Sequence, residues 1–323
     1  MKPNVTFFSL VADDLNEVER VMRTQADGNL PDLKSALDLI LSAGGKRVRP
    51  TLSLLIGRML GAPQEPLITL AVAIELLHTA TLVHDDLIDG SLLRRGMPTL
   101  NSRWSPGATV LTGDFLFARA AEKAAETNSI PLMKIFSHTL SVIVNGEITQ
   151  MLSSKGSIDR SLYYQRIYAK TGSLFETSAC SAAILSPVSD EVVKALGSFG
   201  KNIGIAFQIM DDILDFTGEQ ATLGKPIAND LRQGLITLPA IDFLEKNPQS
   251  RLTEMIKTGS LPDNEDEIKT IIAEIRRSGS IQNAHTEAVN LIKQSIDMLD
   301  LFPPSQEKSA LVDLAHFIVD RKI

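Results

Sequence analysis

The segment LITLAVAIELLHTATLVHDDLID, residues 67–89, decides the fold class of this chain of 323 residues. Its apolar side chains recur at every third or fourth position, which is typical of an α-helix. Glu75 interrupts the apolar run from Leu67 to Leu77, which is shorter than the roughly 20 residues that span a membrane. The segment is therefore predicted to be a long helix of a globular protein that ends in three aspartates.

The same helical spacing recurs through most of the chain, for example in residues 33–41, 268–275 and 311–318. Alternating apolar and polar residues, which are typical of strands, are scarce. Clusters of Gly and Pro divide the chain into about a dozen helices. Because no linker or shift in composition separates its halves, the sequence predicts an all-α fold with residues 1–323 as a single domain.

The composition excludes several classes of protein. Hydrophobic residues make up 44 % of the chain, too many for a disordered protein. The net charge of −7 argues against nucleic-acid binding, which needs clustered positive charge. Cys180 is the one cysteine, so the chain forms no internal disulfide. With neither a signal peptide nor a transmembrane segment expected, the sequence predicts a cytoplasmic protein.

Two acidic motifs share the pattern Asp-Asp-apolar-apolar-Asp, and each follows a long apolar helical segment: DDLID at 85–89 and DDILD at 211–215. Carboxylates four residues apart lie on one face of a helix and repel each other, and a helix C-terminus also disfavours anions. A bound cation would offset both effects. Carboxylates together with substrate phosphates are typical ligands of Mg²⁺, so both motifs are predicted to bind divalent metal ions.

Basic residues beside glycine form four clusters: GGKRVRP at 44–50, RRG at 94–96, KTG at 170–172 and GKP at 224–226. Arg and Lys side chains are well suited to phosphate oxygens, and Gly44-Gly45-Lys46 does not fit a nucleotide-binding P-loop. Together with the acidic motifs, these clusters indicate two diphosphate pockets, one bridged by metal ions and one held directly by cations. The cations expected around one cavity are Lys46, Arg47, Arg49, Arg94, Arg95, Lys170 and Lys225.

With these motifs in this order, the sequence resembles the all-trans polyprenyl diphosphate synthases over essentially its whole length. Further matching blocks are GDFLFARA at 113–120, GEITQ at 146–150, FQIMDDILDFTG at 207–218 and GKPIANDLRQGLITLP at 224–239. The resemblance implies the isoprenoid synthase fold, a helical bundle around a deep central cavity. It also implies a Mg²⁺-dependent prenyltransferase that condenses isopentenyl diphosphate repeatedly onto an allylic diphosphate with a geranyl, farnesyl or geranylgeranyl chain.

The resemblance also implies a role for each matching residue. The ligands of two to three Mg²⁺ ions would be the catalytic aspartates Asp85, Asp86, Asp89, Asp211, Asp212 and Asp215. The allylic diphosphate would be neutralised by the catalytic residues Arg94 and Lys170, with Gln208 and Lys225 near it. The isopentenyl diphosphate would be bound by Lys46, Arg49, His78 and Arg95, and Thr171 would face the carbocation. The chain departs from the family pattern at Ala228, where Gly is common, and at Leu235, where Lys is common.

Three residues are expected to set the length of the product. Thr81 and Ala80, four and five residues before Asp85, are small where short-chain members of the family carry an aromatic ring. Phe136 lies eleven residues before Glu147, so it returns to the same helix face about 16 Å away and would close the cavity. We therefore predict a medium or long product of about six to eight isoprene units from the helix rise.

Four other interpretations stay open. A homodimer is usual in the family and is the main expectation. The first alternative is that the chain is the catalytic subunit of a heteromeric synthase with a small partner. A geranylgeranyl diphosphate synthase is a further alternative. A terpene cyclase would need only one substrate site, and a non-catalytic subunit would have lost aspartates that are all present here. Neither the preferred primer nor the use of the product, as a quinone side chain or a carotenoid precursor, follows from the sequence.

Overall fold

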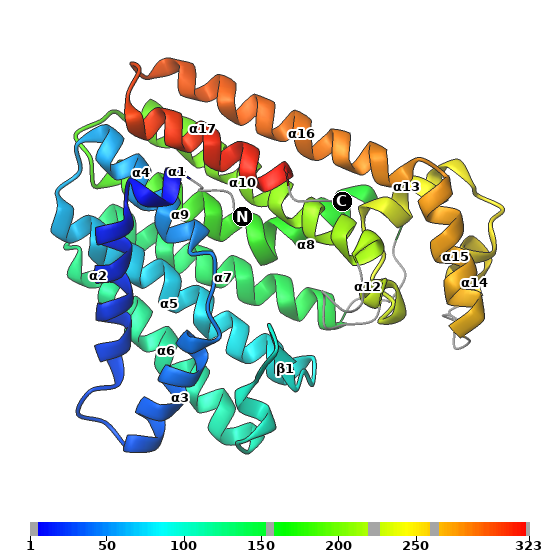
Figure 1. The fold of residues 1–323 in the computed structure, drawn as a ribbon, viewed down its shortest axis with the longest axis horizontal. Helices are drawn as coiled ribbons and strands as arrows, with labels where there is room; N and C mark the ends of the chain where they lie inside the picture. Colours follow the sequence, from blue (N-terminus) through cyan, green and yellow to red (C-terminus); the bar gives the residue numbers. More distant parts are fainter. Residues whose placement is uncertain (1–5, 153–157, 219–226, 259–264, 321–323) are drawn as a thin grey trace. The chain divides into compact units, whose positions relative to one another are not determined.

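A computed structural model describes residues 6–152, 158–218, 227–258 and 265–320 (Figure 1). Within these ranges nearly all regular structure is helical, which confirms the predicted all-α class. The strands described are β1 (Leu93–Arg94) and β2 (Met97–Pro98), which pair antiparallel with Arg94 opposite Met97.

The chain divides into two compact units. The first unit consists of residues 1–140, 174–200 and 300–314, and the second of residues 141–173, 201–299 and 315–323. The single-domain interpretation of residues 1–323 stays a prediction.

The first unit is built around α5 (Gln64–Ile88), which contacts α2, α4 and α6. This helix is long and apolar enough to span a bilayer, yet 67 % of its most apolar stretch is buried in the structure, as in the core helix of a globular protein. The other elements of this unit are α1 (Thr6–Ser9), α2 (Ala12–Arg23), η1 (Thr24–Ala26), α3 (Pro31–Ser42), α4 (Val48–Leu60), η2 (Leu100–Ser102), α6 (Pro106–Glu126) and parts of α7 (Ile130–Leu152), α9 (Ser173–Ile184), α10 (Asp190–Thr217), η4 (Leu299–Leu301) and α17 (Gln306–Val319).

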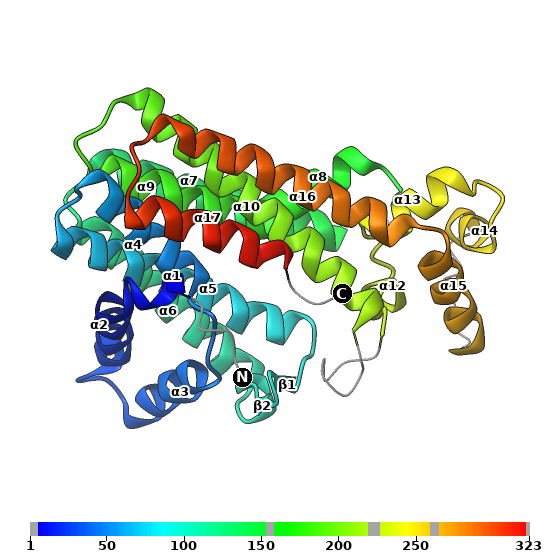
Figure 2. The ribbon, with the colours of Figure 1, turned by 45° about the horizontal axis from the view of Figure 1, so that its top comes forward.

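The second unit holds the remaining parts of α7, α10 and α17 together with a group of shorter helices. Among these, α13, α15 and α16 pack on one another (Figure 2). The bounds of its other elements are α8 (Arg160–Ile167), the π-helical turn η3 (Tyr168–Gly172), α12 (Asn229–Arg232), α13 (Leu238–Lys246), α14 (Arg251–Thr258), α15 (Glu265–Arg277) and α16 (Ser280–Met298).

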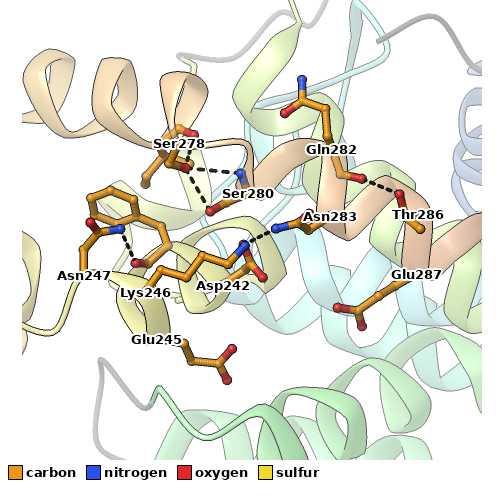
Figure 3. A network of polar contacts seen from close by, with 12 residues as sticks. Asp242, Glu245, Lys246, Asn247, Ser278, Ser280, Gln282, Asn283, Thr286 and Glu287 are labelled. Carbon is orange, nitrogen blue, oxygen red and sulfur yellow. Dashed lines mark hydrogen bonds and ion pairs between the residues drawn. The ribbon is translucent and has the colours of Figure 1, made fainter.

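A polar network joins α13 to α16 (Figure 3), and two of its carboxylates also bind the first residue of α8. The carboxylate of Asp242 accepts hydrogen bonds from Lys246 Nζ at 2.7 Å and from Asn283 Nδ2 at 2.9 Å. Glu245 and Glu287 both bind the guanidinium of Arg160, the first residue of α8. Because α8 continues directly into η3, this network anchors the segment that carries Lys170 and Thr171.

Candidate active site

The first acidic motif ends α5, as the sequence predicts. The helix ends at Ile88, and Asp89 is its C-cap residue. Asp86 is buried, Asp85 is half-buried and Asp89 is exposed. Asp85 and Asp89 therefore remain accessible to a ligand, while Asp86, about 100° further round the helix, lies against protein.

Arg94 of β1 is the partner of Asp86. Its Nε lies 2.9 Å from each carboxylate oxygen, and a second nitrogen of the guanidinium also lies 2.9 Å from the carboxylate. The backbone carbonyl of Asp86 accepts hydrogen bonds from Ser91 N and Asn101 Nδ2, which hold the following loop to the helix end. Two residues that the resemblance assigns to the metal ions and the diphosphate thus offset each other's charge in the free chain.

A cationic group surrounds His78 on α5. Burial, and then the positive charges of Arg49, Arg95, Arg94 and Arg47, hold the pKa of His78 well below its ordinary value, so its ring stays neutral near pH 7. The pKa of Arg95 is also lowered, by burial and then by the charge of Arg94. A bound anion would reduce the repulsion between these positive charges, so this cluster of arginines is suited to bind a diphosphate.

Three of the four predicted isopentenyl diphosphate ligands, Arg49, His78 and Arg95, thus lie within electrostatic range of one another. Arg95 adopts a left-handed backbone and donates to the carbonyl of Gly44, which ties the RRG turn to the loop before α4. Lys46 is an exposed residue of that same loop.

Arg47 differs from the other cations, although the sequence groups it with them. Its guanidinium donates to Glu75 at 2.7 Å and to Glu19 at 2.9 Å, and these carboxylates raise its pKa. Glu75 is buried, so the acidic residue that interrupts the apolar run of α5 is the counter-ion of Arg47. Arg47, which the sequence predicts to be one of the cations around the cavity, therefore fastens α4 to α2 and α5 through its two ion pairs.

The second acidic motif lies in the last turns of α10, as predicted. Asp212 is buried and accepts hydrogen bonds from Tyr163 Oη at 2.7 Å and from Gln208 Nε2 at 2.9 Å. Burial, reinforced by the nearby charge of Asp230, raises the pKa of Asp212 to about 8. A positive charge close to a buried carboxyl group strongly favours its ionised form, and a bound metal ion would supply such a charge.

The π-helical turn η3 presents Lys170 and Thr171, and such turns are common at functional sites. The hydroxyl of Thr171 donates to Gln208 Oε1 at 2.7 Å, so that Thr171, Gln208 and Asp212 form one hydrogen-bonded chain. Lys170 Nζ lies 3.1 Å from Glu147 Oε1 on α7. The structure thus brings the predicted residues Thr171, Gln208, Asp211 and Asp212 to one part of the second unit.

Asp215 is fixed by the segment that follows α10. Its two carboxylate oxygens accept hydrogen bonds from the backbone nitrogens of Asn229 and Asp230 at 3.1 and 3.2 Å. Its backbone carbonyl accepts from Ala228 N at 2.8 Å. The predicted ligand Lys225 lies outside the described residues.

Tyr163 is the functional candidate that the sequence interpretation missed. Its ring is buried and its hydroxyl donates to Asp212. Tyr163→Phe keeps the ring and removes this donor, so we expect turnover to fall about tenfold, as for other partners of metal ligands. Tyr164→Phe is the matched control, because its hydroxyl binds Glu287 instead. Steady-state rates over a range of Mg²⁺ concentrations test this, and equal rates in both variants would contradict it.

Ala228 takes a left-handed backbone with φ +53°, which explains why Gly is common at this position. That conformation costs an L-residue about 1–2 kcal/mol, whereas loss of the buried methyl costs about 0.8 kcal/mol. Ala228→Gly should therefore raise the free energy of unfolding by about 0.2–1.2 kcal/mol. Urea unfolding measures this change. The control is Ala125→Gly at an exposed position of α6, which should lower the free energy of unfolding. If Ala228→Gly also lowers the free energy of unfolding, backbone strain at Ala228 is excluded.

Gly113 of α6 packs directly against His84, the residue before Asp85. A Cβ at Gly113 would lie 2.2 Å from His84 Nε2, so Gly113→Ala must displace the imidazole and the end of α5. We expect a loss of about 1–3 kcal/mol in unfolding free energy together with lower turnover. Gly107→Ala, on the same helix with open space around its Cβ, is the control for thermal unfolding and activity. Wild-type values in the Gly113→Ala variant would contradict the close contact.

The residues expected to set product length all lie in the first unit. Ala80 and Phe136 are buried, and Thr81 is half-buried with its hydroxyl bonded to the carbonyl of His78 at 2.7 Å. Burial agrees with Phe136 as a wall of a cavity and equally with ordinary packing. Its role as the residue that stops chain growth stays a prediction.

No three carboxylate, histidine or cysteine side chains within the described ranges converge on one point as a ready metal cluster. Mg²⁺ commonly takes one or two carboxylates and completes its shell with water and substrate phosphates. The exclusively oxygen donor set of both motifs also fits this ion.

Comparison with known proteins relates the whole chain to one family. The model of the polyprenyl synthetase family matches residues 31–275. Heptaprenyl diphosphate synthase component 2 of Geobacillus stearothermophilus is 36 % identical over 97 % of this chain and 98 % of its own. Octaprenyl diphosphate synthase of Haemophilus influenzae is 33 % identical over 97 % and 95 %.

A solved structure shares the fold along the full length. The polyprenyl synthase of Caulobacter crescentus CB15, complexed with calcium and isoprenyl diphosphate, superposes with a TM-score of 0.92 and 32 % identity, covering 100 % of this chain and 99 % of that one. The predicted isoprenoid synthase fold is thereby confirmed.

Proposed function

Since the chain belongs to the polyprenyl synthetase family of prenyltransferases, we propose that it elongates an allylic diphosphate with isopentenyl diphosphate in a Mg²⁺-dependent reaction. The observation that carries the proposal is the cationic group around a neutral His78, next to the acidic end of α5. An anion would relieve the repulsion among the arginines, and a metal-bridged diphosphate would do the same for the aspartates.

We assign the metal ions to the two acidic motifs, with two to three Mg²⁺ held by Asp85, Asp86, Asp89, Asp211, Asp212 and Asp215. When bound, Mg²⁺ would supply Lewis-acid stabilisation of the departing diphosphate. The calcium and isoprenyl diphosphate in the Caulobacter crescentus structure support a divalent ion beside a prenyl diphosphate.

The chain's own residues would bind, orient and shield the reactants. Arg94 and Lys170 neutralise the allylic diphosphate as its carbon–oxygen bond breaks, and each would leave a carboxylate partner to do so. Lys46, Arg49, Arg95 and the neutral His78 hold isopentenyl diphosphate, whose double bond attacks the allylic cation. A proton then leaves, accepted by the departing diphosphate. The Thr171 hydroxyl oxygen, oriented by its bond to Gln208, faces the cation, and the apolar helices exclude water.

We propose a product of about six to eight isoprene units, because Phe136 lies eleven residues before Glu147 on α7 and would return to the same helix face about 16 Å away. Relatives named for heptaprenyl and octaprenyl products support this range. We place the enzyme in the cytoplasm, as a homodimer.

One observation favours a second candidate, the catalytic subunit of a heteromer. The relatives from Geobacillus stearothermophilus and Bacillus subtilis are both named as component 2 of a heptaprenyl diphosphate synthase. All six motif aspartates are present in this chain, so it would be the catalytic partner of such a pair.

Incubation of the purified chain alone with farnesyl diphosphate, isopentenyl diphosphate and Mg²⁺ tests the proposal. We expect prenyl diphosphates of about six to eight isoprene units by mass spectrometry, and none when EDTA removes the metal. Growth that ends at geranylgeranyl diphosphate would overturn the chain length, and a cyclic hydrocarbon would overturn elongation. A folded chain that forms no product alone would replace the homodimer by the heteromer.

A further inference from the structure

A pocket outside both acidic motifs lies in the second unit, between the segment around α12 and the helix α15. Its volume is about 660 Å³, within the range of small-molecule sites. Four cations and one carboxylate line it, with an apolar floor: Arg232, Lys269, Arg276, Arg277, Glu265, Ile227, Ile272 and Ala273.

Two of the four cations are already engaged. Arg232 forms a two-pronged ion pair with Glu265 at 2.6 and 2.8 Å, and its Nε donates to the carbonyl of Ile227 at 3.0 Å. Arg276 Nε donates to the carbonyl of Phe216 at 2.8 Å. These bonds hold both guanidinium groups at the pocket wall.

The charges of the other two cations, Lys269 and Arg277, are not offset by a strong ion pair within the described residues. Lys269 lies 3.8 Å from Asp266, but both side chains are highly exposed, at 65 % and 90 %, so this pair is weak. The side chain of Arg277 makes no hydrogen bond or ion pair with any residue that the structure describes. The dipole of α15 favours cations in its last turn, which accounts for Arg276 and Arg277 but leaves Lys269 unexplained.

The spacing on α15 places cations and apolar groups on a single helix face. Lys269, Ala273 and Arg276 are separated by four and three residues, and Ile272 lies beside them. Cations gathered above an apolar floor match a ligand with an anionic head and an apolar body. We propose that this pocket binds an organic phosphate or diphosphate, through Lys269, Arg276 and Arg277 at the head and through Ile272 and Ala273 at the body.

The pocket is connected to the second acidic motif through backbone hydrogen bonds. Arg276 holds the carbonyl of Phe216, the residue after Asp215. Arg232 holds the carbonyl of Ile227, and the next residue, Ala228, donates its backbone N–H to Asp215. A phosphate that binds Arg276 competes with the carbonyl of Phe216 for this guanidinium and so changes the restraint beside Asp215. Occupancy of the pocket therefore alters the second acidic motif, with a coupling of about 5–150-fold in affinity as is usual between linked sites.

Hydrogen–deuterium exchange of the full chain in EDTA tests this site, since the readout is binding and does not depend on the reaction. The probes are hexyl phosphate, inorganic phosphate, and vesicles that contain phosphatidylglycerol. Hexyl phosphate should slow exchange in residues 229–232 and 265–277 and bind at least about tenfold more tightly than inorganic phosphate, because its methylenes are buried. The exchange rates of residues 213–217 should change with it.

The double variant Lys269→Ala/Arg277→Ala should weaken hexyl phosphate binding at least about tenfold, since it removes two charge-assisted contacts. The control Lys257→Ala/Lys293→Ala removes the same charge from exposed positions of α14 and α16 and should bind as the wild type does. Protection by hexyl phosphate alone identifies a soluble organic phosphate, and protection by vesicles alone identifies a lipid headgroup. Equal binding by both double variants, or no protection of α15 by any probe, would overturn the site. Unchanged exchange at residues 213–217 would overturn the coupling.

Discussion

Asp85→Ala and Asp211→Ala each lower turnover at least about 100-fold, the effect expected when electrostatic stabilisation of a transition state is removed. Each side chain opens an acidic motif and is half-buried, so its carboxylate is accessible to a ligand. Neither variant should unfold the chain, because the loss of one carboxylate reduces repulsion at the end of its helix. Rates of isopentenyl diphosphate incorporation, together with circular dichroism, measure both effects.

The matched controls are Glu65→Ala in the first turn of α5 and Glu191→Ala in the first turn of α10. Each removes an exposed carboxylate from the same helix at the end opposite the motif. Both should keep the turnover of the wild type. The decisive condition is limiting Mg²⁺, where lost metal ligands matter most. Near-normal rates of Asp85→Ala or Asp211→Ala under that condition would refute the metal-site assignment.

Local features of the sequence were enough to predict the helix ends. In α5 and α10 a long apolar run meets two adjacent aspartates, and both helices end within a few residues of that point, at Ile88 and Thr217. Helical periodicity and polar termination act within a few turns, so they can be recognised without knowledge of the tertiary fold.

Partnerships between distant residues were not predictable in this way. Arg47 belongs to a basic cluster by position, yet it binds Glu19 and Glu75, each 28 residues away. Tyr163 looks like an ordinary core tyrosine until the fold brings it to Asp212, 49 residues later. A pairing of this kind depends on how helices pack, and helix spacing within a segment contains no information about it.

Backbone conformation gave a third kind of signal. The departure at Ala228 from a common Gly was visible in the sequence, and the left-handed φ of +53° supplies its physical reason. The π-helical turn at Tyr168–Gly172 left no comparable trace, because an extra residue in a helical turn does not alter composition. The sequence could therefore single out Lys170 and Thr171 as candidates, while the geometry that presents them required the structure.

Removal of the Phe136 ring should lengthen the product. Phe136 is buried on α7 and its side chain would block the growing chain, so Phe136→Ala opens space beyond the normal product. The same change lowers the free energy of unfolding by about 3–5 kcal/mol, so the milder Phe136→Leu variant is measured beside it. Both should shift the mass distribution of prenyl diphosphates toward more isoprene units.

A loss of packing alone must be separated from a change in cavity length. Phe7→Ala is the matched control, because Phe7 is an equally buried ring of the first unit that lies on α1. It should destabilise the chain by a similar amount and leave the product distribution of the wild type. If Phe136→Leu folds and still makes the wild-type distribution, Phe136 is a packing residue and the end of the cavity lies elsewhere. If Phe7→Ala also lengthens the product, a general loosening of the helices sets chain length, and the assignment to one side chain is wrong.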